Sequence, residues 1–374
     1  MAHTFAERSG ASARNNPMTT KQMINSLQVL RGVFAIFIFL CHYSIGLSDI
    51  MPCGGDCGVA FFMMLSGFVL SAGYEAKLRD RRISYRDFIS RRVSKIYPLH
   101  ILCFIYAILL FRYAFTPKSA AIAALNVSML QSWIPLPEFY FSFNAVSWFL
   151  SDIMFFYLLF PLLVGKRLIY NNRFLVGFAL YIILYLGVIT HISDELLNSI
   201  AYILPLSRLI DFIFGMLLWR LYTHVRNSGK QLLLNNMPSS VRIAVRLAAI
   251  AILCLWIWLY GRIDPAFKLA AFWWPCMALI IISFALSERD SRETDGEKPR
   301  INVLITKALT AFGNLSYTFY MIHVLGISTF KLIIRKTAIE YNPWLMLVIV
   351  FISIVIVSAI IDYTLKRLKW TRSR

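Results

Sequence analysis

The chain has 374 residues, of which 59% are hydrophobic and only 15% are charged, and its formal net charge is +19 at pH 7. Soluble domains carry about 25% charged residues, so this composition excludes a soluble protein and indicates an integral membrane protein. The basic residues lie in short connections between apolar segments, where they orient helices in a bilayer, so the positive charge does not predict nucleic-acid binding.

The chain begins with a polar stretch, residues 1–26, which has few large apolar side chains. We predict a loose leader on the cytoplasmic side of the membrane. The first apolar segment, 27–48, follows it and lacks a small-residue cleavage site, so we expect a retained helix rather than a signal peptide.

Two ionisable side chains occupy this first apolar segment, Arg31 near its start and His42 eleven positions later. At about 100° per residue both project from one face of a helix, about 16 Å apart along its axis. Each has an ordinary explanation, an arginine that snorkels to the headgroups and a histidine bonded to a neighbouring helix. The segment has no functional role only if both explanations are correct at once. Because the two side chains share one face, we instead predict a polar groove along it.

Nine further apolar segments follow, so the chain is predicted to be all-α, a polytopic membrane protein with about ten transmembrane helices. Small residues in the second segment, such as Gly58 and Gly67, favour close packing between helices. The region 117–145 is too short and mixed to cross, and we expect a re-entrant or interfacial piece there. The nine segments cover residues 58–74, 96–115, 146–165, 174–191, 199–221, 243–261, 266–287, 306–334 and 343–365.

Basic residues are concentrated in alternate connections, most densely in 75–95. By the positive-inside rule both termini lie in the cytoplasm and the loop containing CGGDC lies outside; Arg335 and Lys336 are the discordant pair. We predict one transmembrane domain over 27–367, followed by a basic cytoplasmic tail at 368–374.

Six cysteines are present, and four of them lie inside apolar segments, where a buried free thiol is the ordinary case. Cys53 and Cys57 differ because they flank the short CGGDC loop. A local disulfide between them requires that this loop face an oxidising compartment.

A basic cluster of Arg91, Arg92 and Lys95 comes just before the third apolar segment, whose start Pro98 is expected to fix. Such a cluster serves as an orientation signal or as a contact for anionic lipid. It also suits the phosphates of a nucleotide-bearing cofactor. The spacing alone leaves these alternatives open.

Other polar side chains lie within or beside apolar segments. Asn144 and Trp148 suit interfacial anchors, whereas Asp152 in the first turns of a helix is harder to dismiss, although a helix N-terminus would stabilise its charge. Arg208 and Asp211 are three positions apart and are expected to form a structural ion pair.

Ser316, Tyr320 and His323 follow a helical spacing and form one polar stripe in the segment 306–334. Hydrogen bonding between helices and a role in a site explain this stripe equally well. No His, Asp or Glu cluster has the ligand spacing of a metal site, and no G-x-S-x-G elbow or phosphate-binding glycine loop is present.

The chain resembles the acyltransferase 3 family of bacterial membrane O-acyltransferases, which modify cell-surface and secreted carbohydrates. The resemblance runs from Leu27 to His323 and rests on motifs that occur in the family's order. These are LQVLRG with the Arg31/His42 pair, GVAFFMMLSGFVLS, RRVSKIYP, SWFLSDIMFFYLLFP, RLIDFIFGM and GNLSYTFYMIH.

The resemblance implies transfer of an acyl group, normally acetyl from acetyl-CoA, to a hydroxyl of a surface or lipid-linked glycan, at the inner (cytoplasmic) membrane of a bacterium. His42 matches the family's histidine and Arg31 its paired basic residue. Related sequences usually carry Glu where this chain has Ile153, with Asp152 one position earlier. A shift of one position rotates a helical side chain by about 100°.

We therefore expect His42 and Arg31 to be catalytic, with His42 as general base on the acceptor hydroxyl or as a transiently acylated nucleophile. Arg91, Arg92 and Lys95 are expected to bind the CoA phosphates. Besides acyl-CoA and the carbohydrate, only membrane lipids are expected as partners, with no metal and no nucleic acid. The expected acceptor-binding residues are Asn144, Trp148, Asp152, Tyr320 and His323.

Two other functions fit the same sequence. A transporter or flippase for a glycan or lipid-linked intermediate would also have many spans and a polar groove, although the chain has no internal symmetry of the kind that transporters commonly carry. A catalytically inactive sensor or scaffold built on the same fold is the third interpretation, which the Ile153 departure keeps open.

Overall fold

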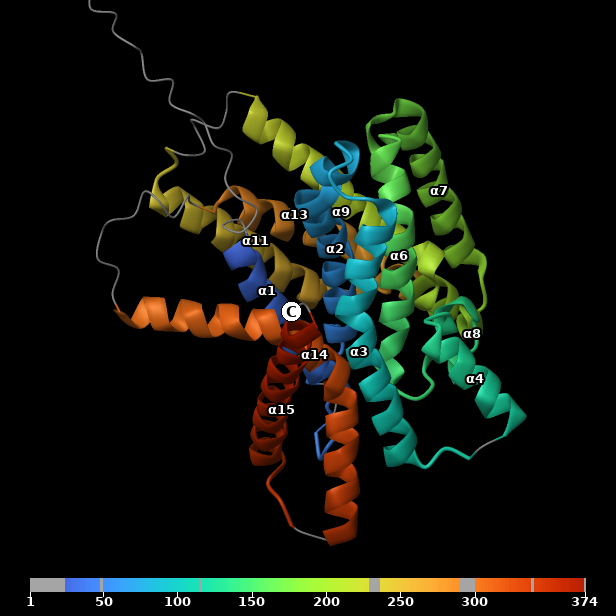
Figure 1. The fold of residues 1–374 in the computed structure, drawn as a ribbon. Helices are drawn as coiled ribbons and strands as arrows, with labels where there is room; N and C mark the ends of the chain where they lie inside the picture. The colour runs from blue at the N-terminus through green and yellow to red at the C-terminus, as the bar shows by residue number, and fades with distance from the viewer. Residues whose placement is uncertain are drawn as a thin grey trace, which may run out of the picture.

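The computed structural model describes residues 24–47, 50–114, 116–228, 236–288, 300–337 and 340–372. All regular structure in this part of the chain is helical and no strand occurs there, so the all-α prediction is confirmed (Figure 1). Most of the predicted leader, 1–26, lies outside the described residues, and its last three residues belong to the first helix.

Each of the ten predicted apolar segments coincides with a helix in the described part of the chain. Eight helical segments there are long and apolar enough to cross a membrane. The other two, Ser26–His42 and Ala271–Leu286, are shorter apolar helices. A multi-pass membrane protein is therefore supported. The helices are α1 (Ile24–His42), α2 (Gly54–Arg79), α3 (Tyr85–Phe111), α6 (Trp148–Gly165), α7 (Asn172–His191), α9 (Pro205–Asn227), α11 (Ser239–Leu259), α13 (Trp274–Leu286), α14 (Arg300–Thr337) and α15 (Pro343–Arg372).

Short helices make up the region that was predicted not to cross the membrane. α4 (Pro117–Val127) has 11 residues, which span about 16 Å and are too few to cross a bilayer. The other short elements are η1 (Gln131–Trp133), α5 (Pro137–Tyr140), η2 (Ala145–Ser147), η3 (Leu168–Tyr170), α8 (Asp194–Leu197), η4 (Asn198–Ile203), η5 (Tyr260–Arg262), α12 (Pro265–Lys268) and η6 (Ala271–Trp273).

The helix boundaries around CGGDC differ from the prediction. α1 ends at His42 rather than at 48, and α2 begins at Gly54, so most of CGGDC forms a helical turn in place of a loop. The reason is local: the Cys57 amide donates to the Cys53 carbonyl at 3.0 Å, as in a helix. Both thiols are buried and free, so the structure contains no disulfide between them.

The basic cluster lies inside a helix and not ahead of one. α3 begins at Tyr85 because Ser84 caps it, accepting a hydrogen bond from the Asp87 amide at 3.0 Å. Pro98 lies within α3, so the predicted helix start at 96 is wrong. The cap satisfies one amide of the first turn, so the helix begins eleven positions before the predicted start. The helix then fixes which face each basic side chain occupies.

Glycines bring α2 and α9 into backbone contact. A Cβ atom on Gly67 would lie 2.0 Å from the Phe212 carbonyl oxygen, and one on Gly215 would lie 1.8 Å from the Met64 carbonyl oxygen. Only glycine fits at these two positions, because any larger residue would push the helices apart. The predicted packing role of the second apolar segment is confirmed at Gly67.

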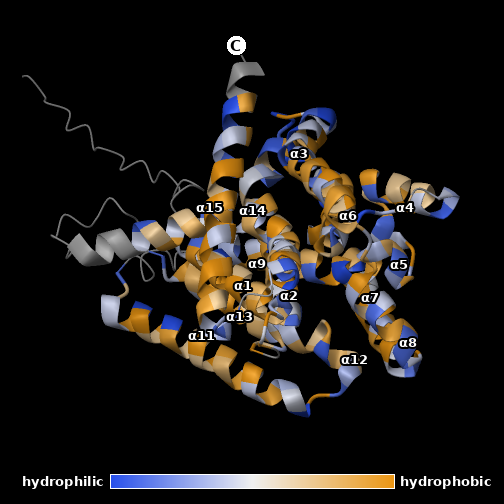
Figure 2. Ribbon diagram, turned by 90° about the horizontal axis from the view of Figure 1, so that it is seen from below, coloured by the Kyte–Doolittle hydropathy of each residue, from blue (hydrophilic) through white to orange (hydrophobic). Residues whose placement is uncertain are grey.

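The buried apolar residues form two clusters. The larger one joins α2, α7, α9, α11 and α13, the smaller one joins α14 and α15, and α1, α3 and α6 contribute to both. Outside these clusters the helices present apolar side chains, such as Trp258, which is 60% exposed. Hydrophobic residues predominate along α11 at the rim of the bundle (Figure 2), as expected for a surface that faces lipid.

Candidate active site

The site is built where α1 crosses α14. A Cβ atom on Gly313 would lie 1.8 Å from the Gln28 carbonyl oxygen, so the two backbones touch at this point. Three residues after Gly313, Ser316 accepts a hydrogen bond from Arg31 Nε at 3.2 Å. The polar stripe of α14 therefore faces the polar side of α1.

Further along the same crossing, two histidines meet. His42 Nδ1 lies 3.3 Å from His323 Nε2, and the two ring centroids are 5.0 Å apart. His42 is exposed at the end of α1, whereas His323 is buried. The pairing joins residues 281 positions apart in the chain.

The hydrogen bonds fix the tautomer of each histidine. His323 Nδ1 lies 2.6 Å from the Tyr320 carbonyl oxygen, and His42 Nδ1 lies 2.8 Å from the Ile38 carbonyl oxygen. A carbonyl oxygen only accepts, so both Nδ1 atoms carry the proton. In the neutral rings His323 Nε2 then accepts from His42 Nδ1–H. His42 Nε2 keeps the lone pair that a general base needs.

A cavity of about 140 Å³ is lined by Tyr320 and by neither histidine. Arg31, Arg92 and Lys95 line it, together with Ser316 and Tyr320. The Tyr320 ring centroid is 5.7 Å from that of His323. Three predicted cationic residues, from α1 and α3, therefore share one cavity that ends beside the histidine pair. We call it the basic cavity.

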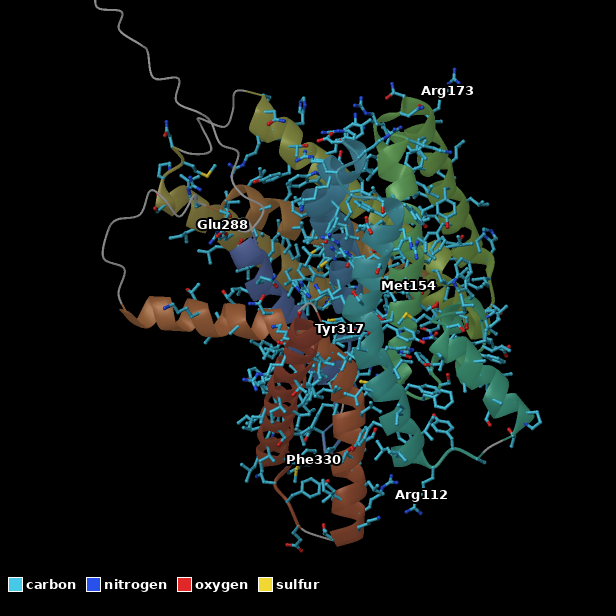
Figure 3. The ribbon with its side chains drawn as sticks, in the orientation of Figure 1. Arg112, Met154, Arg173, Glu288, Tyr317 and Phe330 are labelled. Carbon is cyan, nitrogen blue, oxygen red and sulfur yellow. The ribbon has the colours of Figure 1, made fainter. Side chains whose placement is uncertain are left out.

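The cavity occupies the junction between the two apolar clusters. Phe62, Phe149 and Tyr157 line it and pack against both clusters. Tyr317 also lines it, and its hydroxyl donates to the Ile96 carbonyl at 2.8 Å, joining α14 to α3 (Figure 3). Incomplete packing between two cores provides space for a ligand at this place.

Arg92 is the most tightly held of the cations. Its guanidinium carbon lies 4.2 Å from the Tyr74 ring centroid and 5.8 Å from that of Tyr157, within cation–π distance. Its Nε atom is buried and has no hydrogen-bond partner. Arg91, by contrast, is exposed and does not line the cavity. The predicted cluster is therefore split: Arg92 and Lys95 line the cavity, and Arg91 lies outside it.

The predicted acceptor-binding residues also divide. Tyr320 lines the cavity and donates to the Val146 carbonyl at 3.0 Å. Asn144 donates to the Met321 carbonyl at 2.8 Å, close to the histidine pair in sequence, and its Oδ1 atom has no partner. Trp148 is buried, its ring packs at a tilt against Tyr202, and it does not line the cavity.

Asp152 and Ile153 point to different places, as a 100° rotation requires. Ile153 lines the basic cavity, whereas Asp152 is fully buried and accepts from the Ser132 hydroxyl at 2.7 Å. Arg208 and Asp211 form the expected ion pair, at 3.4 Å with both side chains fully buried.

Sequence reasoning missed Tyr157 and Tyr317 as lining residues, because an aromatic residue in an apolar segment gives no signal of its own. It also missed the direct contact of His42 with His323, although the polar stripe 316–323 contained one partner. Within the described residues, no three His, Cys, Asp or Glu side chains group in a way that suits a metal ion.

Comparisons with known proteins identify the family of the chain. A family model described as "Acyltransferase domain" matches residues 24–363. Acyltransferase MdmB from Streptomyces mycarofaciens is 35% identical over 152 residues, which cover 37% of this chain and 38% of the relative. The match thus spans well under half of the relative's length. No solved structure matches the chain. The match over 24–363 confirms the resemblance found in the motifs, and the chain belongs to this family of membrane acyltransferases.

Proposed function

We propose that this protein transfers an acyl group, acetyl in the first instance, from acyl-CoA to a hydroxyl of a cell-surface or exported carbohydrate at a bacterial inner membrane. The observation that carries the proposal is one continuous arrangement. A cavity lined by Arg31, Arg92 and Lys95 ends at Tyr320, whose ring adjoins the His42/His323 pair.

The basic cavity suits the donor. Arg31 and Arg92 offer planar guanidinium groups that match phosphate oxygens, and Lys95 adds a third positive charge. With these side chains on the phosphates, the thioester arm of CoA runs along α1 toward His42, about 16 Å further along the helix axis. The apolar walls exclude water from the thioester.

His42 Nε2 then acts as general base. It takes the proton of the acceptor hydroxyl as that oxygen attacks the thioester carbonyl carbon. The carbon–sulfur bond breaks, and the CoA sulfur takes the proton back from His42. His323 Nε2, 3.3 Å from His42 Nδ1, accepts from the imidazolium and stabilises its charge.

A transporter is the second candidate, and the polar groove along α1 is the observation that favours it. The two proposals differ in one measurable respect. Only the enzyme converts acyl-CoA to CoA when the acceptor is present.

The test uses the full chain and mass spectrometry of surface glycans from cells with and without it. His42→Ala should remove the acyl mass from the glycan, because loss of a general base costs about 10²–10⁴-fold in rate. His191→Ala is the matched control, since His191 also ends a helix with Nδ1 2.8 Å from the carbonyl four residues earlier. Full acylation of the glycan by the His42→Ala protein would rule out His42 as the general base.

A second measurement separates the general base from an acylated nucleophile. Purified protein is mixed with radiolabelled acetyl-CoA and no acceptor, then quenched within seconds. The general-base mechanism predicts unlabelled protein. Label that appears on the wild-type protein and not on His42→Ala would instead identify an acyl-histidine.

A further inference from the structure

A second and larger cavity lies on another face of α2. Its volume is about 860 Å³, and it is lined by the last turns of α2, the last turns of α9 and Tyr170. Leu70 lines the basic cavity, whereas the next residue, Ser71, lines this one, so α2 separates the two. The C-terminal ends of α2 and α9 lie at the upper side of the bundle in Figure 1.

Two buried polar groups in this cavity lack a partner. Ser71 is 1% exposed and Glu75 is 5% exposed. Ser71 Oγ and Glu75 Oε2 make no hydrogen bond. The two residues are four positions apart on α2 and so occupy the same face of that helix. Buried polar groups are normally paired, so this pair predicts a ligand that donates hydrogen bonds.

The remaining oxygen of Glu75 is already occupied. The Tyr170 hydroxyl donates to Glu75 Oε1 at 2.5 Å. Burial, and then the hydrogen bond to Glu75, raise the pKa of Tyr170 to about 12, so its proton stays in place at neutral pH. Among the described residues no ion pair with Glu75 is found, so its carboxylate has no cationic partner of its own.

Two arginines, Arg220 and Arg79, lie near the unpaired oxygens of Ser71 and Glu75. The Arg220 guanidinium carbon lies 5.0 Å from the Tyr170 ring centroid, and Arg220 Nη1 donates to the Ile169 carbonyl at 2.8 Å. Arg79, at the end of α2, also lines the cavity. The site therefore offers acceptors for a cation and donors for an anion within one space.

The cavity lies at the depth of lipid headgroups. The 26 residues of α2 extend about 39 Å, whereas the hydrocarbon layer of a bilayer is about 30 Å thick. Its last turns, with Glu75 and Arg79, therefore reach the interface. The rest of the lining includes Trp219 and Leu221, and Leu221 is 48% exposed. Apolar side chains there suit the start of an acyl chain.

We propose that this cavity binds the headgroup of a phospholipid that carries a primary ammonium and a phosphate, as phosphatidylethanolamine does. The ammonium donates to Glu75 Oε2 and Ser71 Oγ, and the phosphate accepts from Arg220 and Arg79. A trimethylated ammonium has no N–H to donate, so phosphatidylcholine lacks the interaction with the two acceptors.

The test places the purified full-length protein in nanodiscs of phosphatidylglycerol mixed with either phosphatidylethanolamine or phosphatidylcholine. Native mass spectrometry after release from the nanodisc counts the retained lipid. We expect phosphatidylethanolamine to be retained about tenfold more strongly, the effect of one charge-assisted hydrogen bond. Equal retention of the two lipids by the wild-type protein would overturn the proposal without any variant.

Two variants test which side chain binds the ammonium and which binds the phosphate. Glu75→Gln should abolish the preference between the lipids, whereas Arg220→Gln should weaken both equally, because the phosphate is common to both. Glu138→Gln, on the exposed carboxylate that pairs with Lys118, is the control and should change nothing. A preference that survives Glu75→Gln would contradict the proposal. Displacement of the lipid by an equal concentration of soluble phosphoethanolamine would show that the site takes a free metabolite instead. None of these readouts depends on acyl transfer.

Discussion

Arg91 and Arg92 are adjacent in the sequence, but their side chains lie in different surroundings. Arg92 is held between aromatic rings at the wall of the basic cavity, with a buried Nε atom free to donate. Arg91 is exposed on another face of α3. The motif RRVSKIYP predicted a phosphate site without choosing between them, because the choice depends on the rotation of α3 against α1 and α6.

We therefore predict that Arg92→Gln weakens binding of CoA to the purified protein by about tenfold, the effect of one lost charge-assisted contact. Arg91→Gln, which removes the same charge one position away, should bind CoA like the wild type. Calorimetric titration with CoA measures both. An equal loss in the two variants would mean that long-range charge, and not contact, attracts the donor.

At the residue scale His323 and His42 differ in their surroundings, because His323 is buried and offers Nε2 as an acceptor, whereas His42 is exposed at the end of α1. His323→Phe keeps a ring in this place and removes the acceptor for His42 Nδ1–H. We predict that kcat falls about tenfold, the worth of one hydrogen bond, while KM for the acyl donor is unchanged.

The second readout for His323 is spectroscopic. In protein labelled with ¹⁵N-histidine, His42 should show the Nδ1–H tautomer in the wild type and in the variant, because the Ile38 carbonyl accepts from Nδ1–H in both. The ¹⁵N chemical shift of His42 Nδ1 should nevertheless change, because one of its two acceptors is lost. An unchanged shift, or a change of tautomer, would assign His323 a different role, and the result does not depend on the identity of the acceptor.

Helix boundaries illustrate what local sequence decides at the scale of elements. Hydropathy placed a helix at every apolar segment, since a membrane helix satisfies its own backbone. The ends were harder to place: Ser84 starts α3 well before Pro98, and α1 stops at His42. Caps and helix turns made of polar or small residues carry no hydropathy signal.

At the scale of helix pairs, glycines set how closely two helices approach, and a substitution at the contact of α2 with α9 tests this. Gly215→Ala would place a methyl carbon 1.8 Å from the Met64 carbonyl oxygen and force α9 away from α2. We predict a loss of about 1–3 kcal/mol in stability, seen as a lower Tm in detergent by tryptophan fluorescence.

Gly177→Ala is the matched control in a membrane helix, because nothing lies within 4 Å of its Cβ position. Its Tm should stay the same or rise slightly, since alanine restricts the unfolded chain more than glycine does. A similar fall in both variants would show that glycine flexibility, and not close approach, matters in these helices.

For the whole molecule, the distribution of charge predicts an orientation that the fold alone leaves open. Arg112, at the end of α3, and Arg173, near the start of α7, lie at opposite ends of the bundle (Figure 3). If the positive-inside rule holds, Arg86 in the first turn of α3 is cytoplasmic and Lys118 in α4 is outside. His42 then lies toward the outer side and the basic cavity toward the cytoplasm.

Cysteine labelling in intact cells tests this orientation. Both positions are exposed. Lys118→Cys should react with a membrane-impermeant maleimide, and Arg86→Cys should react only after permeabilisation, with the wild-type chain giving the background of the native cysteines. The reverse pattern would invert the topology, and reaction of both from outside would mean that α3 does not cross.

The sequence by itself determined that the chain is a helical membrane protein of the acyltransferase family and that Arg31 and His42 share one face of the first helix. Hydropathy, charge and short motifs are properties of neighbouring residues, so one chain suffices to detect them. Only the tertiary structure decided that His42 meets His323, that Arg92 and not Arg91 enters the cavity, and that Ile153 faces the cations in place of Asp152. These outcomes depend on where glycines let helices cross and on how each helix is rotated, which the packing of the whole bundle sets.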